Sequence, residues 1–225
     1  MGRVVRLNEQ EFAGLINSIL NMALNPNKTS TTSTNSSDSS GDEKNSGSTS
    51  LGKISAKGQE LLNNPTFKEK LKQISSEIGI PESSILKLMK HESGLDPSIK
   101  NSIGCVGLIQ FCPDTRGGGT KTIAGKTYRL SDLQNDLGLQ MDAIREFWLA
   151  GKKSGKIKNP ADLYIFNFFP IAAGKSDDFV LQTKSLSGKT VARSNPLFNK
   201  KLGKPIDSPL TVADLKQYYQ QTGMV

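Results

Sequence analysis

A carboxylate near the end of an apolar helical pattern is the first side chain in the sequence with the environment of a catalytic group. In the segment 85–94, Ile85, Leu88 and Met89 mark one helical face, and Glu92 follows them by seven, four and three residues. This spacing places Glu92 on the apolar side of the helix, in the last turn, where the helix dipole disfavours negative charge. Burial and the dipole both raise a carboxyl pKa, and a carboxyl protonated at neutral pH can act as a general acid. The alternative is a glutamate that extends into solvent or pairs with a lysine.

The single histidine and the two cysteines offer weaker chemistry. His91 lies about 100° from Glu92 around the helix, so we expect it at the surface. It precedes both Cys105 and Cys112, and nothing orders it as the base of a Cys–His pair. The cysteines flank residues 106–111, and either a disulfide or two partly buried thiols fits the sequence. With one His and two Cys, zinc clusters, haem and iron–sulfur sites with their usual ligands are excluded, and we expect no metal and no cofactor.

Residues 1–24 are predicted to form an amphipathic docking helix. Asn8 can cap it, Glu11 completes a capping box, and Leu7 can pack on Phe12. Acidic residues at positions 9 and 11, and the lack of a small-x-small cleavage site, argue against a secretory signal peptide. A helix packed on its own domain is the alternative. The apolar face comprises Phe12, Leu15, Ile16, Ile19 and Ala23.

Residues 25–52 are predicted to be a flexible linker, and residues 53–225 a folded domain. Between Thr29 and Ser50, 14 of 22 residues are Ser or Thr, too polar to offset the entropy of ordering. Residues 53–225 hold 25 Lys and Arg against 16 Asp and Glu, so nearly all of the positive charge lies in the domain. A short helix on a tether ahead of a larger domain is the layout of an anchor and its cargo.

Helical signals dominate the folded domain, which predicts a mainly α class with little sheet. Pro65 and Pro81 each open a helix, and Gly94 ends the second. A Gly-rich stretch at 116–129 predicts a loop or a small hairpin. The expected helices are 65–78, 81–93, 133–149 ended by Gly151, a nearly all-apolar segment 163–169 after Pro160, and 212–221 capped by Thr211.

Read with Glu92, three segments resemble the lytic transglycosylases of the goose-type lysozyme-like superfamily. Glu92-Ser93 stands at a helix end and is followed by Leu-Asp-Pro at 95–97. Gly-Leu-Ile-Gln at 107–110 is similar to the family's Gly-Leu-Met-Gln, and Pro113-x-Thr115 follows it. Residues 162–170 occupy the place of the third motif, usually Ala-Tyr-Asn, and look like the phage-borne branch. The resemblance spans residues 61–181.

This resemblance implies a lysozyme-like fold and cleavage of the β-1,4 bond between N-acetylmuramic acid and N-acetylglucosamine. Glu92 would be the acid and then the base, with the muramyl 6-hydroxyl attacking to give a 1,6-anhydro end. Ser93 and Gln110 would contact substrate or orient Glu92, and Tyr164 would steer the acid. Their structural alternatives are a helix-end hydroxyl for Ser93 and a core aromatic for Tyr164. A hydrolase normally needs a second carboxylate, for which Asp96 is available, although Asp-Pro is better explained as a turn.

The expected partner is therefore the peptidoglycan glycan strand, whose carboxylates suit a basic domain. The sequence has no zinc knuckle, helix-turn-helix spacing or aromatic-interleaved basic strip, so nucleic acid is not expected. It has no apolar run of about 20 residues, so no membrane insertion is expected. We predict a virion-borne phage enzyme docked through residues 1–24 to a tail or baseplate protein. A free endolysin, a hydrolytic muramidase and a non-catalytic structural or wall-binding protein are the alternatives.

Overall fold

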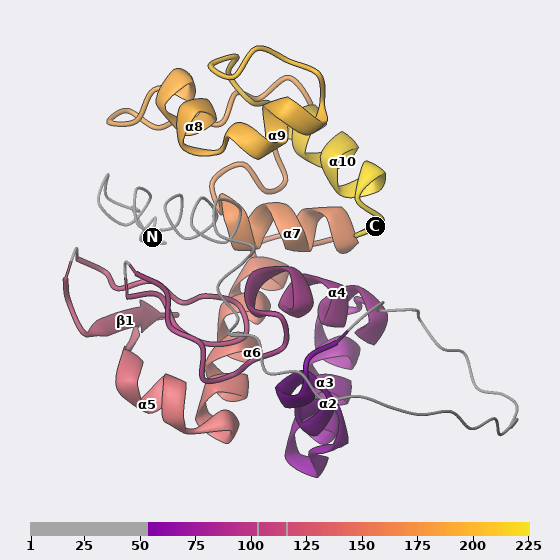
Figure 1. Ribbon diagram of the computed structural model, residues 1–225, viewed down its shortest axis with the longest axis vertical. Coiled ribbons are helices and arrows are strands. Elements are labelled where there is room, and N and C mark those ends of the chain that lie inside the picture. The colour runs from indigo at the N-terminus through magenta and orange to yellow at the C-terminus, as the bar shows by residue number, and fades with distance from the viewer. Residues whose placement is uncertain (1–53, 103, 116) are drawn as a thin grey trace, which may run out of the picture.

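The computed structural model describes residues 54–102, 104–115 and 117–225, and these fold mainly into helices around one apolar core (Figure 1). The predictions for residues 1–24 and 25–52 lie outside the described residues. The helices are α2 Ala56–Asn63, α3 Pro65–Ile78, α4 Glu82–Ser93, α5 Leu130–Asn135, α6 Leu137–Lys153, α7 Pro160–Phe168, α8 Gly188–Ser194, α9 Pro196–Lys201 and α10 Val212–Gln221. The two strands are β1 Thr120–Ile123 and β2 Lys126–Arg129.

The helices stack in two parts with α7 between them (Figure 1). Helices α2 to α6 form the lower part in this view, where α3 packs against both α4 and α6. Helices α8, α9 and α10 lie above α7, and α10 contacts both α7 and α9. The predicted mainly α class is confirmed. Among the described helices, none combines the length and the apolar character needed to cross a bilayer.

The helices α3 and α4 begin and end where the sequence predicts. Asn64 caps α3 by accepting a hydrogen bond from the Phe67 N–H, and Pro65 takes the first helical position, where a missing N–H costs nothing. The buried residues of α3 are the predicted ones, Phe67, Leu71, Ile74 and Ile78. Helix α4 ends at Gly94, whose φ of 63° lies in the left-handed region that glycine adopts without steric cost.

The prediction of one helix over 133–149, ended by Gly151, is wrong. Asp136 has extended backbone angles that end α5, and its side chain accepts from the Leu139 N–H to start α6. Helix α6 then continues through Gly151 to Lys153. A Cβ at Gly151 would lie 2.6 Å from the Ile157 Cδ1 and 2.9 Å from the Phe166 Cζ. The glycine is therefore explained by close packing and not by a helix stop.

The remaining predicted elements are confirmed with small shifts. Helix α7 starts at Pro160 and buries every residue from 162 to 168. Thr211 caps α10 in a complete capping box with Asp214. The Gly-rich stretch forms the small hairpin, in which β1 and β2 pair antiparallel around Ala124 and Gly125, both at positive φ as a two-residue hairpin turn requires. The short helices α2, α5, α8 and α9 were not predicted.

Candidate active site

Glu92 lies on the buried face of α4, in its last turn. Its side chain is 8% exposed and shares this face with Ile85, Leu88 and Met89. Burial raises the pKa of the Glu92 carboxyl to about 7. Among the described residues, no ion pair joins Glu92 to a lysine or arginine, so the ordinary alternative of a solvated or lysine-paired glutamate does not hold. His91 is exposed beside it, as expected.

Asn167, on the last full turn of α7, donates the hydrogen bond that Glu92 receives. The Asn167 Nδ2 lies 3.3 Å from the Glu92 Oε1, and both side chains are buried. This bond favours the carboxylate and lowers the Glu92 pKa, but by less than burial raises it. An amide cannot change its charge, so Asn167 holds the carboxyl in place in both protonation states. Residue types alone offer one signal for this role: Asn167 is a polar residue in a helix whose other residues after Asp162 carry large apolar or aromatic side chains.

Two tyrosines complete the surroundings of Glu92. Tyr164 lies one turn before Asn167 on α7, and its ring centroid is 5.0 Å from that of Tyr219 on α10. Burial first, and the charge of Glu92 second, raise the pKa of both phenols, so both stay neutral. The Tyr164 hydroxyl donates to the Ser84 carbonyl on α4 at 3.3 Å. Tyr164 is thus close enough for the Glu92 charge to affect its pKa. Its role in orienting the Glu92 carboxyl stays a prediction.

Tyr219, like Asn167, lies near Glu92 and is not among the residues that the sequence predicts for the site. It is 2% exposed and lies 127 positions after the glutamate, on the capped C-terminal helix. Helix α10 packs on α7, which packs on α4, and this stacking brings the phenol within electrostatic range of Glu92. No spacing in the sequence links these two positions, because the link is made entirely by helix packing.

Ser93 and Gln110 are buried, and each donates a hydrogen bond to a carbonyl three or four residues earlier. The Ser93 hydroxyl donates to the Met89 carbonyl, one turn earlier in α4, at 2.7 Å. The Gln110 Nε2 donates to the Gly107 carbonyl at 2.9 Å, and its Oε1 accepts from the Asn101 amide at 3.0 Å. Gln110 adopts a φ of 57°, unusual for a residue with a side chain, and these bonds stabilise that turn. A substrate-contacting role for either residue stays a prediction.

The segment 105–112 around Gln110 is a closed loop. Val106 and Phe111 exchange both backbone hydrogen bonds, and a disulfide joins Cys105 to Cys112 just outside them. Of the two alternatives left open by the sequence, the structure therefore has the disulfide.

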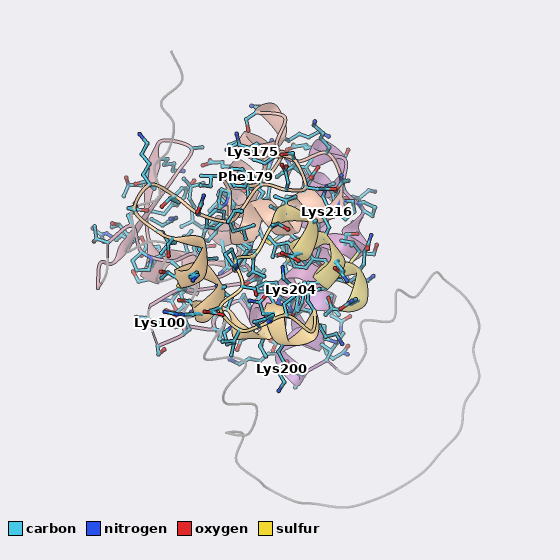
Figure 2. The ribbon with its side chains drawn as sticks, turned by 90° about the horizontal axis from the view of Figure 1, so that it is seen from above. Lys100, Lys175, Phe179, Lys200, Lys204 and Lys216 are labelled. Atoms are coloured by element: carbon cyan, nitrogen blue, oxygen red, sulfur yellow. A yellow bond between two sulfur atoms is a disulfide. The ribbon has the colours of Figure 1, made fainter. Side chains whose placement is uncertain are left out.

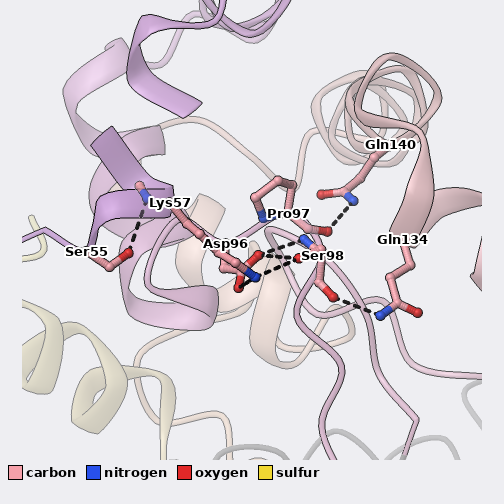
Figure 3. A network of polar contacts seen from close by, with 8 residues as sticks. Ser55, Lys57, Asp96, Pro97, Ser98, Gln134 and Gln140 are labelled. Atoms are coloured by element: carbon pink, nitrogen blue, oxygen red, sulfur yellow. Dashed lines mark hydrogen bonds and ion pairs between the residues drawn. The ribbon is translucent and has the colours of Figure 1, made fainter. Parts of the chain in front are cut away.

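Gln140 of α6 anchors this loop to its neighbours. It is fully buried, its Oε1 accepts from the Leu108 N–H at 2.8 Å, and its Nε2 donates to the carbonyls of Pro97 and Leu133. Figure 3 shows the bond to Pro97 beside the bond from Gln134 to the Ser98 carbonyl. One amide thus joins the loop that follows Glu92, the loop that carries Gln110 and the start of α6. A buried amide with its bonds satisfied fixes the relative positions of the segments that it links.

Asp96 belongs to this polar network and forms a turn. Its carboxylate accepts from the Ser98 N–H at 2.9 Å and pairs with the Lys57 Nζ at 2.8 Å (Figure 3). Burial would raise the Asp96 pKa, but the bonds from Lys57 and Ser98 outweigh it and lower the pKa. Asp96 is therefore held as a paired carboxylate, which favours the turn interpretation over a water-activating base.

The arrangement suits one proton transfer at a time at Glu92. Near pH 7 this carboxyl exists in both protonation states, so it can donate a proton and then accept one. The neutral amide of Asn167 orients the carboxyl without fixing its charge. Within the described ranges, no cluster of three or more His, Cys, Asp or Glu residues suited to a metal ion is found.

Comparison with known families assigns the segment that carries Glu92. Residues 69–137 match the family described as the transglycosylase SLT domain. The match contains Glu92, Ser93 and Gln110, and it ends before α7 and α10, which supply Asn167, Tyr164 and Tyr219. No curated protein and no solved structure gave a match. Residues 69–137 are thus similar to a lytic transglycosylase domain, and they lie within a mainly helical fold.

Proposed function

We propose that this chain cleaves the β-1,4 bond between N-acetylmuramic acid and N-acetylglucosamine in peptidoglycan, with Glu92 as its acid and base. The observation that carries the proposal is the buried Glu92 carboxyl, with a pKa of about 7, within the matched segment. A carboxyl with this pKa is protonated often enough at neutral pH to protonate a leaving oxygen.

The reaction requires two proton transfers at the same carboxyl. Glu92 first protonates the glycosidic oxygen as the bond to the muramyl C1 breaks. The resulting carboxylate then removes the proton from the muramyl 6-hydroxyl, whose oxygen bonds to C1. The products are a 1,6-anhydro-muramyl end and a glycan with a free 4-hydroxyl, and Glu92 is again protonated.

Hydrolysis is the alternative that the same residue could support. An inverting glycosidase places a second carboxylate about 6.5–9.5 Å from the acid to activate water, and a retaining one places it at about 5–5.5 Å. In the part of the chain that the structure describes, Glu92 shares no hydrogen bond with a carboxylate, and Asp96 is paired with Lys57. These contacts support intramolecular attack by the 6-hydroxyl.

Product analysis by mass spectrometry of digested peptidoglycan separates these alternatives. We expect anhydro-muramyl ends from the wild type, and a loss of rate of about 100- to 10,000-fold in Glu92→Gln, because general acid–base catalysis contributes about this much. Asp96→Asn is the matched control and should keep the anhydro product. Reducing muramyl ends would identify a hydrolase, and release by Glu92→Gln at the wild-type rate would reject the proposed acid. No release by the wild type would favour a non-catalytic role.

We further propose that the enzyme is carried in a phage particle, bound to a tail or baseplate protein through residues 1–24. The support is the amphipathic pattern of residues 1–24, followed by the Ser/Thr-rich segment 25–52. Deletion of residues 1–28 should abolish incorporation into particles while leaving glycan cleavage intact. Unchanged incorporation would contradict the docking role and favour a free endolysin.

A further inference from the structure

Residues 184–204, which comprise α8, α9 and their flanks, concentrate the positive charge of the folded part. Residues 54–225 hold 24 Lys and Arg and 16 Asp and Glu. Residues 184–204 hold six of the cations and no carboxylate, so about an eighth of the length supplies three quarters of the net charge. We call this segment the basic cap; its cations are Lys184, Lys189, Arg193, Lys200, Lys201 and Lys204.

The cations of the basic cap mostly face solvent without acidic partners. Arg193 lies 3.6 Å from Asp207, and Lys204 pairs with Asp214 at 2.6 Å. The other four are exposed, and no ion pair joins them to any carboxylate among the described residues: Lys184, Lys189, Lys200 and Lys201. Such an excess of like charge repels itself, and an anionic partner relieves that repulsion.

The apolar and aromatic side chains of the basic cap argue against a membrane and against nucleic acid as its partner. Leu186, Val191, Ala192 and Phe198 are buried in the core. Leu197, at 38% exposure, is the one large apolar side chain of the basic cap that faces solvent, so no broad apolar face is available to enter a membrane. The aromatic residue of the segment, Phe198, is buried and cannot stack on bases, and only one of the six cations is an arginine. Exposed lysines without stacking aromatics suit a flexible polymer with spaced negative charges.

The position of the basic cap connects it with the active site. It forms the end of the molecule farthest from α2 and α3 (Figure 1), and Figure 2 looks onto this end with Lys200 and Lys204 labelled. Helix α9 contacts α10, which carries Tyr219 toward Glu92. The basic cap therefore belongs to the part of the fold that completes the catalytic surroundings, and it lies outside the matched residues 69–137.

We propose that the basic cap binds the peptidoglycan strand through the carboxylates of its stem peptides, away from the bond that is cleaved. This inference rests on the proposed function, since it assigns the polymer that the site acts on. The cap would hold the insoluble wall by salt-sensitive attraction, while a short soluble glycan would be cleaved without it.

The test measures cosedimentation with purified sacculi stripped of covalently attached phosphate polymers, in a Glu92→Gln background that leaves the glycan intact. One variant changes the four exposed and unpaired lysines of the basic cap to Gln. The matched control removes the same charge from four exposed lysines elsewhere: Lys68, Lys72, Lys153 and Lys158. A surface of complementary charge raises the rate of association by about 10- to 1000-fold. We therefore expect the variant with the four cap lysines changed to Gln to lose at least about tenfold in affinity for sacculi at low salt. The control should lose less than about threefold, and changing the four cap lysines to Arg should keep binding.

Three outcomes would overturn the proposal. Equal losses in the two Gln variants would mean that net charge, and no particular surface, attracts the wall. Tighter binding to duplex DNA, or to vesicles of anionic phospholipid, with the same lysine dependence would assign the cap to another partner. Loss of binding in the Arg variant would exclude a charge-based surface. A second assay, turnover of a short soluble glycan by proteins that retain Glu92, separates this proposal from the proposed function. The variant with four cap lysines changed to Gln should cleave this glycan at the wild-type rate. If neither protein cleaves it, the proposed glycan cleavage is rejected, whereas the wall-binding role is not.

Discussion

Replacing Glu92 by Gln should stabilise the protein more at high pH than at low pH. The folded state holds the carboxyl in an environment that raises its pKa from 4.5 to about 7. Below pH 4.5, a carboxyl whose pKa is raised in the folded state does not destabilise the protein, because it is protonated in both the folded and the unfolded state. The cost grows between pH 4.5 and 7, because folding then requires a buried carboxylate or an extra proton. Gln has nearly the same shape as the protonated acid and does not carry this cost.

The size of the effect follows from the two pKa values. One pKa unit corresponds to about 1.4 kcal/mol, so the rise from 4.5 to about 7 amounts to about 3 kcal/mol when the carboxyl is fully ionised in both states. The free energy of unfolding of Glu92→Gln, relative to the wild type, should therefore increase by about 3 kcal/mol between pH 4 and pH 8. Most of the change should fall between pH 5 and pH 7, where the unfolded chain is ionised and the folded one is not.

Urea denaturation at a series of pH values measures this difference directly. Glu69→Gln is the matched control, because Glu69 is an exposed carboxylate on α3. We expect the control to change the free energy of unfolding by less than about 0.5 kcal/mol at every pH. A Glu92→Gln difference that stays constant with pH would refute the raised pKa, and with it the general-acid reasoning. A difference that falls as pH rises would mean that the fold stabilises the Glu92 carboxylate.

Three other changes test the surroundings of Glu92. Asn167→Ala removes the hydrogen bond that lowers the Glu92 pKa, so the alkaline limb of the pH–rate profile should move to higher pH; an unmoved limb would contradict that contact. Gln140→Leu leaves two buried backbone groups and one part-buried carbonyl unpaired, and should destabilise the fold by about 2–4 kcal/mol in urea. Gln134→Leu, which removes an exposed hydrogen bond of a half-buried side chain, should cost under about 1 kcal/mol. Reduction of the disulfide opens a loop of eight residues and should lower stability by about 2–3 kcal/mol, measured as a thiol-dependent shift in thermal unfolding; no shift would mean that the hydrogen bonds alone fix the loop.

The helices with strong local signals could be predicted closely from the sequence. Helices α3, α4 and α10 each combine an apolar face with a clear start or end residue, such as Pro65, Gly94 or Thr211. A helix end is predicted wrongly where a glycine is required for close packing and not for ending the helix. Gly151 has the residue type of a helix stop, but it lies within α6, and it is a glycine because Phe166 and Ile157 leave no room for a Cβ. The short helices α8 and α9 lack a long periodic pattern, and tertiary packing stabilises them.

The local pattern of residues is enough to locate the acid. Helical spacing alone puts Glu92 on the apolar face of its helix, because residues three, four and seven apart share a face whatever the rest of the fold does. It also determined the mainly α class and the segment that resembles lytic transglycosylases.

The surroundings of that acid depend on how distant helices pack together. Asn167 and Tyr219 lie 75 and 127 residues after Glu92, and packing of α4, α7 and α10 brings the three together. Other tertiary contacts placed the disulfide loop against Gln140 of α6 and put α8 and α9 at the end of the molecule away from α2 and α3 (Figure 1). Contacts between distant segments depend on how whole helices stack, and no local pattern of residues encodes that stacking.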